Sequence, residues 1–168
     1  MRTILVPYDG SIQADDLLHL ACEVVGAEGR VVALYVTRVP PSLPLDPLPA
    51  HVDAAGNDAL DRAEQVMRRY DGIVETRLTR ARRVRDAIVG EAGAIGADAI
   101  FLPLAAGGPW RRLRRAWDAW MVVRRAPCRV LLGYSPDLGD LYASNVSSMA
   151  AGRLYGTDRP LPRQAHGL

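Results

Sequence analysis

A polar turn near the start of the chain offers the residues best placed for chemistry. Asp9, Gly10 and Ser11 follow the apolar residues 4–6, and a helical pattern begins at Ile12. A carboxylate and a hydroxyl on either side of a glycine could contact a ligand, because glycine lets the backbone approach closely. The simpler interpretation is a turn in which Asp9 or Ser11 caps the helix. By itself, the turn does not establish a function.

Residue types alone exclude several kinds of catalytic site. All 21 basic residues are arginine, which rules out a Schiff-base lysine and a Walker-type phosphate loop. Ser11 lacks the Gly-x-Ser-x-Gly surroundings of a nucleophile elbow. Asp15 and Asp16 should point in different directions from one helix, so they form no paired metal site. The histidines are scattered over helix, loop and tail: His19, His51 and His166. We therefore expect no catalytic residue and no bound metal.

The composition is that of one soluble domain with a real core, at 168 residues, 49% hydrophobic and 24% charged. A net charge of +2 identifies no partner. Cys22 and Cys128 lie among apolar residues without a second ligand at metal-binding spacing, which predicts buried thiols in a reducing cytosol. The sequence shows neither a signal-peptide core nor an apolar run of about 20 residues, so we expect a cytoplasmic protein.

Strand and helix patterns alternate along the chain, which predicts an α/β fold with an open parallel sheet. Three continuous apolar runs are typical of strands covered on both faces, at residues 4–6, 31–36 and 99–102. Residues 74–79 instead alternate apolar and polar side chains, which favours an edge strand. Helical patterns separate the strands, at residues 17–25, 52–67 and 84–95.

Two segments interrupt this alternation. Residues 39–50 carry five prolines and should form a stiff extended connection. Residues 135–168 show no period, so we expect a domain over 1–134 followed by a flexible C-terminal tail over 135–168. Docking of this tail on a neighbouring subunit is the alternative.

Three segments in order resemble the universal stress protein family. They are residues 4–11, the proline-rich stretch, and residues 126–132, and the resemblance covers residues 1 to about 134. It implies a five-stranded parallel sheet of order 3-2-1-4-5 with helices on both faces, in a Rossmann-like fold of the adenine nucleotide alpha hydrolase type. It also implies that Asp9 and Val36 would meet an adenine base; ordinary turn and strand packing is the alternative for both residues.

The family members that bind ATP carry Gly-x-x-Gly, nine residues, then Gly-Ser or Gly-Thr after strand four. In this chain those positions hold Pro103, Ala106, Ala116 and Trp117. Proline has no N–H to donate to a phosphate, alanine adds a β-carbon, and an indole replaces a small hydroxyl at a helix N-terminus. We therefore expect that a triphosphate does not bind in the family manner and that no cofactor is needed.

A shifted phosphate site is the alternative. Gly107 and Gly108 could form a different turn, with Arg111 and Arg112 supplying charge in place of amide donors. ATP or AMP would then bind at a candidate adenine-nucleotide site composed of Asp9, Val36, Gly107 and Gly108.

Residues 109–125 predict a basic amphipathic helix. One face would carry Trp110, Leu113, Trp117, Trp120 and Met121, and the other Arg111, Arg112, Arg114, Arg115 and Arg125. The simpler interpretation is a packed helix with a solvated arginine face that has Asp118 as a partial partner. The alternative is contact with a protein or an anionic partner through Arg111, Arg112, Arg114 and Arg115, with Trp110 or Trp120 free for an interface. Nucleic acid is a less favoured partner, since no recognition element extends the basic residues.

The last strand, Arg129, Val130, Leu131 and Leu132, would form the second edge of the sheet without a charge among its three apolar residues. The resemblance implies that two subunits pair through this strand. We therefore expect a homodimeric, non-catalytic module in the stress response. A regulatory sensor that binds ATP or AMP is the alternative, and nucleotide hydrolysis is less favoured because the sequence offers no phosphate cradle or metal carboxylates.

Overall fold

The computed structural model describes residues 2–44, 51–104 and 109–134, with the side chains of residues 51, 52, 104, 109–116 and 134 left aside. Strands and helices alternate along this part of the chain. They are β1 (Thr3–Pro7), α1 (Ile12–Val25), β2 (Arg30–Arg38), α2 (His51–Met67), β3 (Ile73–Ala81), α3 (Val84–Ala94), β4 (Ala99–Leu104), α4 (Pro109–Arg125) and β5 (Arg129–Tyr134). The tail that we expect over 135–168 lies outside the described residues.

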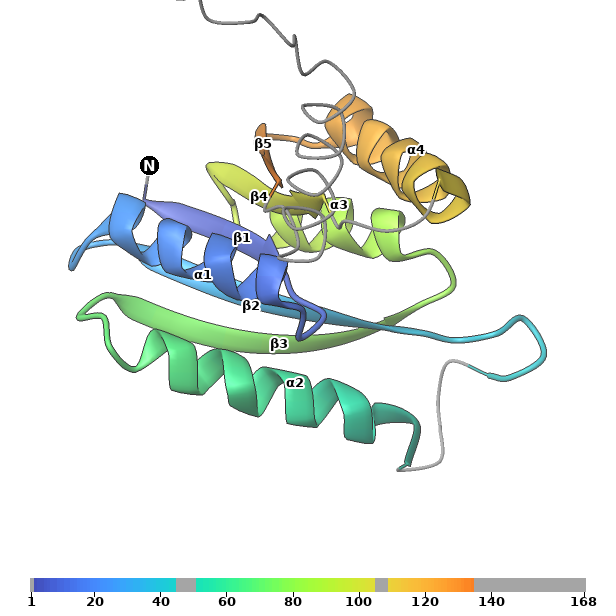
Figure 1. Cartoon of the computed structure of the whole chain (residues 1–168), viewed down its shortest axis with the longest axis horizontal. Helices are drawn as coiled ribbons and strands as arrows, with labels where there is room; N and C mark the ends of the chain where they lie inside the picture. Colours follow the sequence, from blue (N-terminus) through green and yellow to red (C-terminus); the bar gives the residue numbers. More distant parts are fainter. Residues whose placement is uncertain (1, 45–50, 105–108, 135–168) are drawn as a thin grey trace, which may run out of the picture. The chain divides into compact units, whose positions relative to one another are not determined.

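The strands form one parallel sheet in the order β3-β2-β1-β4-β5, which confirms the expected fold. Successive strand residues alternate between two cores. Ile4 and Val6 of β1 pack with α1 and α2, whereas Leu5 packs on the opposite face with α3 and α4. Figure 1 shows the two pairs of helices on the two faces of the sheet. Burial on both faces explains why the central strands are continuous apolar runs.

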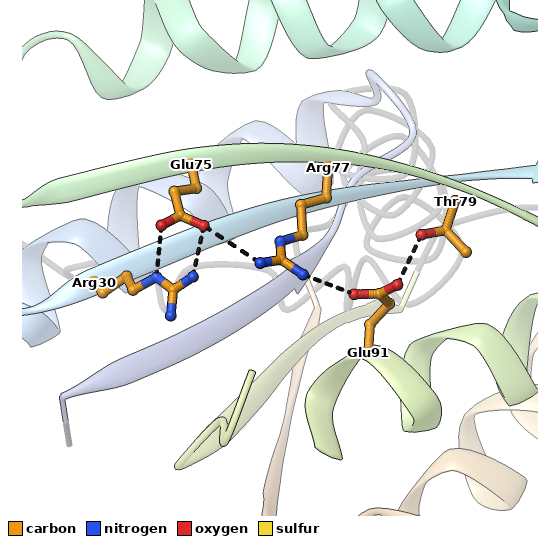
Figure 2. Close-up of polar contacts among 5 residues, drawn as sticks. All are labelled: Arg30, Glu75, Arg77, Thr79 and Glu91. Atoms are coloured by element: carbon orange, nitrogen blue, oxygen red, sulfur yellow. Dashed lines mark hydrogen bonds and ion pairs between the residues drawn. The ribbon is translucent and has the colours of Figure 1, made fainter. Parts of the chain in front are cut away.

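The first edge strand is β3, as its alternating pattern predicts, and none of its residues is fully buried. On one of its faces, charged groups form a chain that reaches α3 (Figure 2). Arg30 donates two hydrogen bonds to Glu75, whereas Arg77 lies 3.8 Å from Glu75 and 3.3 Å from Glu91. The Thr79 hydroxyl donates a 2.9 Å hydrogen bond to Glu91. This network fixes α3 against the outer strand and places charge on an edge that would otherwise invite pairing.

Helix α4 packs differently from its predicted orientation. Trp117 and Trp120 are 61% and 54% exposed, whereas Ala119 and Val122 are buried against the sheet. Trp117 therefore does not pack inward as expected, whereas the exposure of Trp120 agrees with the alternative that leaves it free. The small side chains of Ala119 and Val122 let the helix approach the sheet closely and turn the indoles outward. Asp118 pairs with Arg85 of α3. Of the other residues named for the two faces, Met121 is partly buried and Arg125 is exposed. The side chains of the other six lie outside the described residues: Trp110, Leu113, Arg111, Arg112, Arg114 and Arg115.

The connection after β2 begins with a turn. The Leu43 N–H donates a 3.1 Å hydrogen bond to the Pro40 carbonyl oxygen. Residues 40–43 therefore form a turn, and the predicted extended conformation was wrong for them. Residues 45–50 of the proline-rich segment lie outside the described residues.

Candidate functional site

The sheet opens where its strand order reverses, between β1 and β4. Within the described strands, β1 pairs with β4 only at Ile4–Ala99 and Leu5–Ile100. In contrast, β1 stays beside β2 as far as Pro7, and β4 stays beside β5 as far as Leu104. The carboxyl ends of β1 and β4 therefore diverge. An open parallel sheet binds ligands at such a point.

A pocket of about 340 Å³ occupies this opening. Its walls come from the carboxyl ends of β1, β2 and β4 and from the helices α3 and α4. Leu34, Ile88 and Leu102 contribute apolar surface, and the volume is that of a small-molecule site. The charged residues among the described lining are Asp9, Arg38, Arg85 and Asp118. Two positive and two negative side chains leave the described lining with no net charge.

The two residues expected to meet an adenine base line the same pocket, Asp9 from the turn after β1 and Val36 from the neighbouring strand β2. Asp9 is exposed, and its Oδ1 accepts a 3.1 Å hydrogen bond from the Ser11 N–H. Gly10 between them has φ of 77°, a conformation that favours glycine. The Ser11 hydroxyl accepts a 3.3 Å hydrogen bond from the Ala14 N–H at the start of α1, which confirms the predicted cap. The turn therefore leaves one Asp9 oxygen without a role in the cap.

Tyr8 forms part of the pocket wall and is almost fully buried. Its hydroxyl donates a hydrogen bond to Asp15 of α1, and Asp15 also accepts one from Arg62 of α2. Burial, and after it the Asp15 carboxylate, raises the pKa of Tyr8. The phenol therefore stays neutral, and its hydroxyl hydrogen is committed to Asp15. As predicted, Asp15 and Asp16 point in different directions, since Asp16 is exposed.

The four positions compared with the family's phosphate motif lie in different places relative to the pocket. Pro103 lines the pocket at the end of β4, so a residue without an N–H stands there, as predicted. Trp117 is 61% exposed and is not among the residues that line the pocket. The next residue, Asp118, faces the pocket instead. Ala106, Gly107 and Gly108 lie outside the described residues, as does the side chain of Ala116.

Sequence reasoning missed the most polar contact of the pocket. Arg85 Nη1 donates a 2.7 Å hydrogen bond to Asp118 Oδ1, which joins α3 to α4. One signal could have revealed Arg85: α3 follows the carboxyl end of β3 almost directly, so its first turn lies at the ligand-binding edge. Asp118 has no such signal, because its position depends on which face of α4 meets the sheet.

No group of three or more histidine, cysteine or acidic side chains in the described ranges could hold a metal ion. Across those ranges, no helix combines the length and apolar character needed to cross a membrane.

Solved structures of similar fold include several universal stress proteins. UspA from Lactobacillus plantarum is 24% identical with a TM-score of 0.63, covering 78% of this chain and 96% of that one. The Archaeoglobus fulgidus universal stress protein, solved in complex with dAMP, is 18% identical with a TM-score of 0.61, covering 79% and 96%. A universal stress protein in complex with cAMP is 22% identical with a TM-score of 0.55, covering 78% and 94%. A search of curated proteins finds no match.

Residues 1–132 match the sequence model of the Universal stress protein family. The match spans every strand and helix that builds the pocket, together with most of β5. On this evidence the chain belongs to the universal stress protein family.

Proposed function

We propose that the protein is a non-catalytic, homodimeric module of the cytoplasmic stress response, and that it does not hold a nucleoside triphosphate in the family manner. Family membership supports the regulatory role. The proposal that a triphosphate does not bind rests on the residues that line the pocket between β1 and β4.

The pocket is poorly suited to a chain of phosphates. Pro103 at its wall has no N–H, whereas phosphate-binding loops depend on backbone N–H groups. The positive charge of Arg38 and Arg85 is opposed by Asp9 and Asp118 in the same lining. A triphosphate carries several negative charges, so it would meet two carboxylates and no described surplus of positive charge.

The proposed lack of catalysis agrees with the residues that the chain offers. Without lysine, it has no P-loop lysine to contact the β- and γ-phosphates. His19 contacts Tyr70, with 2.7 Å between Nδ1 and the hydroxyl oxygen, and does not line the pocket. The side chains of His51 and His166 lie outside the described residues.

The apolar edge strand β5 supports the homodimer. Strand β5 is the second edge of the sheet, and Leu131 and Leu132 are 39% and 48% exposed. Unlike β3, it has a single charged residue, Arg129, at its start. Pairing of two β5 strands would satisfy their free backbone groups and cover both leucines.

Thermal unfolding with added nucleotides tests the ligand part of this proposal. A ligand at 100 times its dissociation constant adds about 2.7 kcal/mol to the free energy of unfolding, which moves the melting temperature by several degrees. We expect no such shift with ATP and Mg²⁺. A saturable shift with ATP that exceeds the shift with adenosine would overturn the proposal. Steady Mg²⁺-dependent release of phosphate would overturn the non-catalytic role.

A second candidate function is a sensor for an adenine nucleoside or a nucleotide with fewer phosphates. The pocket itself favours it, because Asp9 and Val36 line a cavity of suitable size. Two relatives of the same fold were solved with dAMP and cAMP. A thermal shift with adenosine or AMP, but not with ATP, would support this sensor and would still agree with the loss of triphosphate binding.

A further inference from the structure

Arg85 and Asp118 join two helices at the pocket wall. Arg85 is the second residue of α3, Asp118 lies in the middle of α4, and both line the pocket. The side chain of Arg85 is 22% exposed, whereas that of Asp118 is 50% exposed. The cation is therefore held in the wall, and its carboxylate partner is largely solvated.

Within the part of the chain that the structure describes, the guanidinium of Arg85 lacks an acceptor for one of its buried N–H groups. Its Nη1 donates to Asp118, but its buried Nε has no hydrogen-bond acceptor among the described residues. Asp86 Oδ1 lies 3.8 Å from Nε, which is too far for a hydrogen bond. A guanidinium offers five N–H donors in one plane, so Arg85 can donate hydrogen bonds to another anionic group.

Asp118 is a weak competitor for this cation. A half-exposed carboxylate keeps much of its hydration, and an ion pair at such a site contributes little to stability. The anionic group of a ligand within the pocket would be more desolvated, and its hydrogen bonds to Arg85 would be stronger. One such group could replace Asp118 as the partner of Arg85. Further negative charges would then face Asp9 and Asp118.

We propose that Arg85 selects ligands by their charge. It would exchange the Asp118 carboxylate for the single phosphoryl group of a nucleoside monophosphate. This inference rests on the sensor function proposed above, and names its ligand class and the residue that selects it. Asp118 acts as an internal anion that weakens binding of every phosphorylated ligand. Neither residue belongs to the positions compared with the family's phosphate motif.

Calorimetric titration of the full chain with adenosine, AMP and ATP tests the proposal. The variants are Arg85→Gln, which removes the cation, and Asp118→Asn, which removes the competitor. Arg125→Gln is the matched control, because Arg125 of α4 pairs with Asp86 of α3 at 3.3 Å but does not line the pocket. Circular dichroism would establish that each variant is folded.

We expect AMP to bind the wild type more tightly than adenosine or ATP. Asp118→Asn should strengthen AMP binding by roughly tenfold, the effect of a charged hydrogen bond, while adenosine binding stays the same. Arg85→Gln should reduce AMP affinity to that of adenosine, and Arg125→Gln should change neither. If adenosine binds but Asp118→Asn leaves AMP affinity unchanged, Arg85 does not select charge and the sensor function stands. If no variant binds adenosine or AMP, both proposals are wrong.

Discussion

The Thr37 hydroxyl of β2 donates a 3.0 Å hydrogen bond to Asp53 Oδ1 in the first turn of α2. Arg80 of β3 donates to the other carboxylate oxygen, Oδ2, with its Nε at 3.0 Å. One carboxylate thus ties the start of α2 to two neighbouring strands, beyond the proline-rich connection. The hydrogen bond from Arg80, together with the one from Thr37, lowers the pKa of Asp53.

Replacing Asp53 with asparagine should lower the free energy of unfolding near neutral pH. It should also make that free energy depend less on pH in the acid range. Because the folded-state pKa is depressed, the ionised carboxylate stabilises the fold above its unfolded pKa, and this stability is lost as the pH falls through the folded value. The melting temperatures of wild type and variant should therefore begin to converge below about pH 4 and should meet only below the depressed folded-state pKa. Asp58→Asn, at an exposed position on the same helix, is the control and should follow the wild type. A constant difference between Asp53→Asn and wild type at all pH values would contradict this role.

Substitution by alanine should change the free energy of unfolding in opposite directions at two glycines. Gly10 has φ of 77°, and its added Cβ would meet Ala59 at an ordinary 3.7 Å, so Gly10→Ala should cost about 1–2 kcal/mol of backbone strain. Gly90 lies on an exposed turn of α3 with nothing within 4 Å of an added Cβ. Gly90→Ala should therefore stabilise the fold by about 0.5–1 kcal/mol. Urea unfolding measures both, and a Gly10→Ala variant as stable as the wild type would show that the turn can rearrange.

The sheet could be predicted from the sequence because its signals are local. Continuous runs mark the central strands and alternation marks β3, since each pattern reports how many faces of a strand are covered. The orientation of α4 could not be predicted from the same reasoning. The helical pattern groups the large Trp117 and Trp120 on one apolar face, but the residues that pack closely against the sheet are Ala119 and Val122.

The pocket was predictable in its position but only partly in its chemistry. The resemblance pointed to Asp9 and Val36, and topology explains why they converge: Asp9 follows β1, Val36 lies near the carboxyl end of β2, and both strand ends lie at the same edge. The contact between Arg85 and Asp118 joins positions 33 residues apart on different helices. It depends on the relative rotation of α3 and α4, which no local pattern encodes.

Charges on β5 should separate the proposed dimer. The double variant Leu131→Lys, Leu132→Lys places two cations on the edge strand, where a second copy would bring the same charges into contact. Light scattering after size-exclusion chromatography should give a mass near 18.3 kDa, that of one chain. Ile73→Lys is the control, because Ile73 is 59% exposed on the opposite edge strand, and it should remain dimeric. A wild type that runs as a monomer, or a double variant that stays dimeric, would refute pairing through β5.

The two cysteines should differ in their reactivity towards an alkylating agent. Cys22 is 3% exposed, and burial, with a smaller contribution from Glu23, raises its pKa to about 11. At pH 8 only about a thousandth of this thiol is ionised, and the thiolate is the reactive form. Cys128 is half-buried, and burial followed by the Asp98 carboxylate also raises its pKa. We expect Cys128 to react slowly and Cys22 only when the fold opens, so that Cys22 labelling accelerates in step with urea unfolding. Mass spectrometry of the Cys128→Ser and Cys22→Ser variants separates the two rates. Rapid labelling of Cys22 in the folded Cys128→Ser protein would show that α1 detaches locally from the sheet.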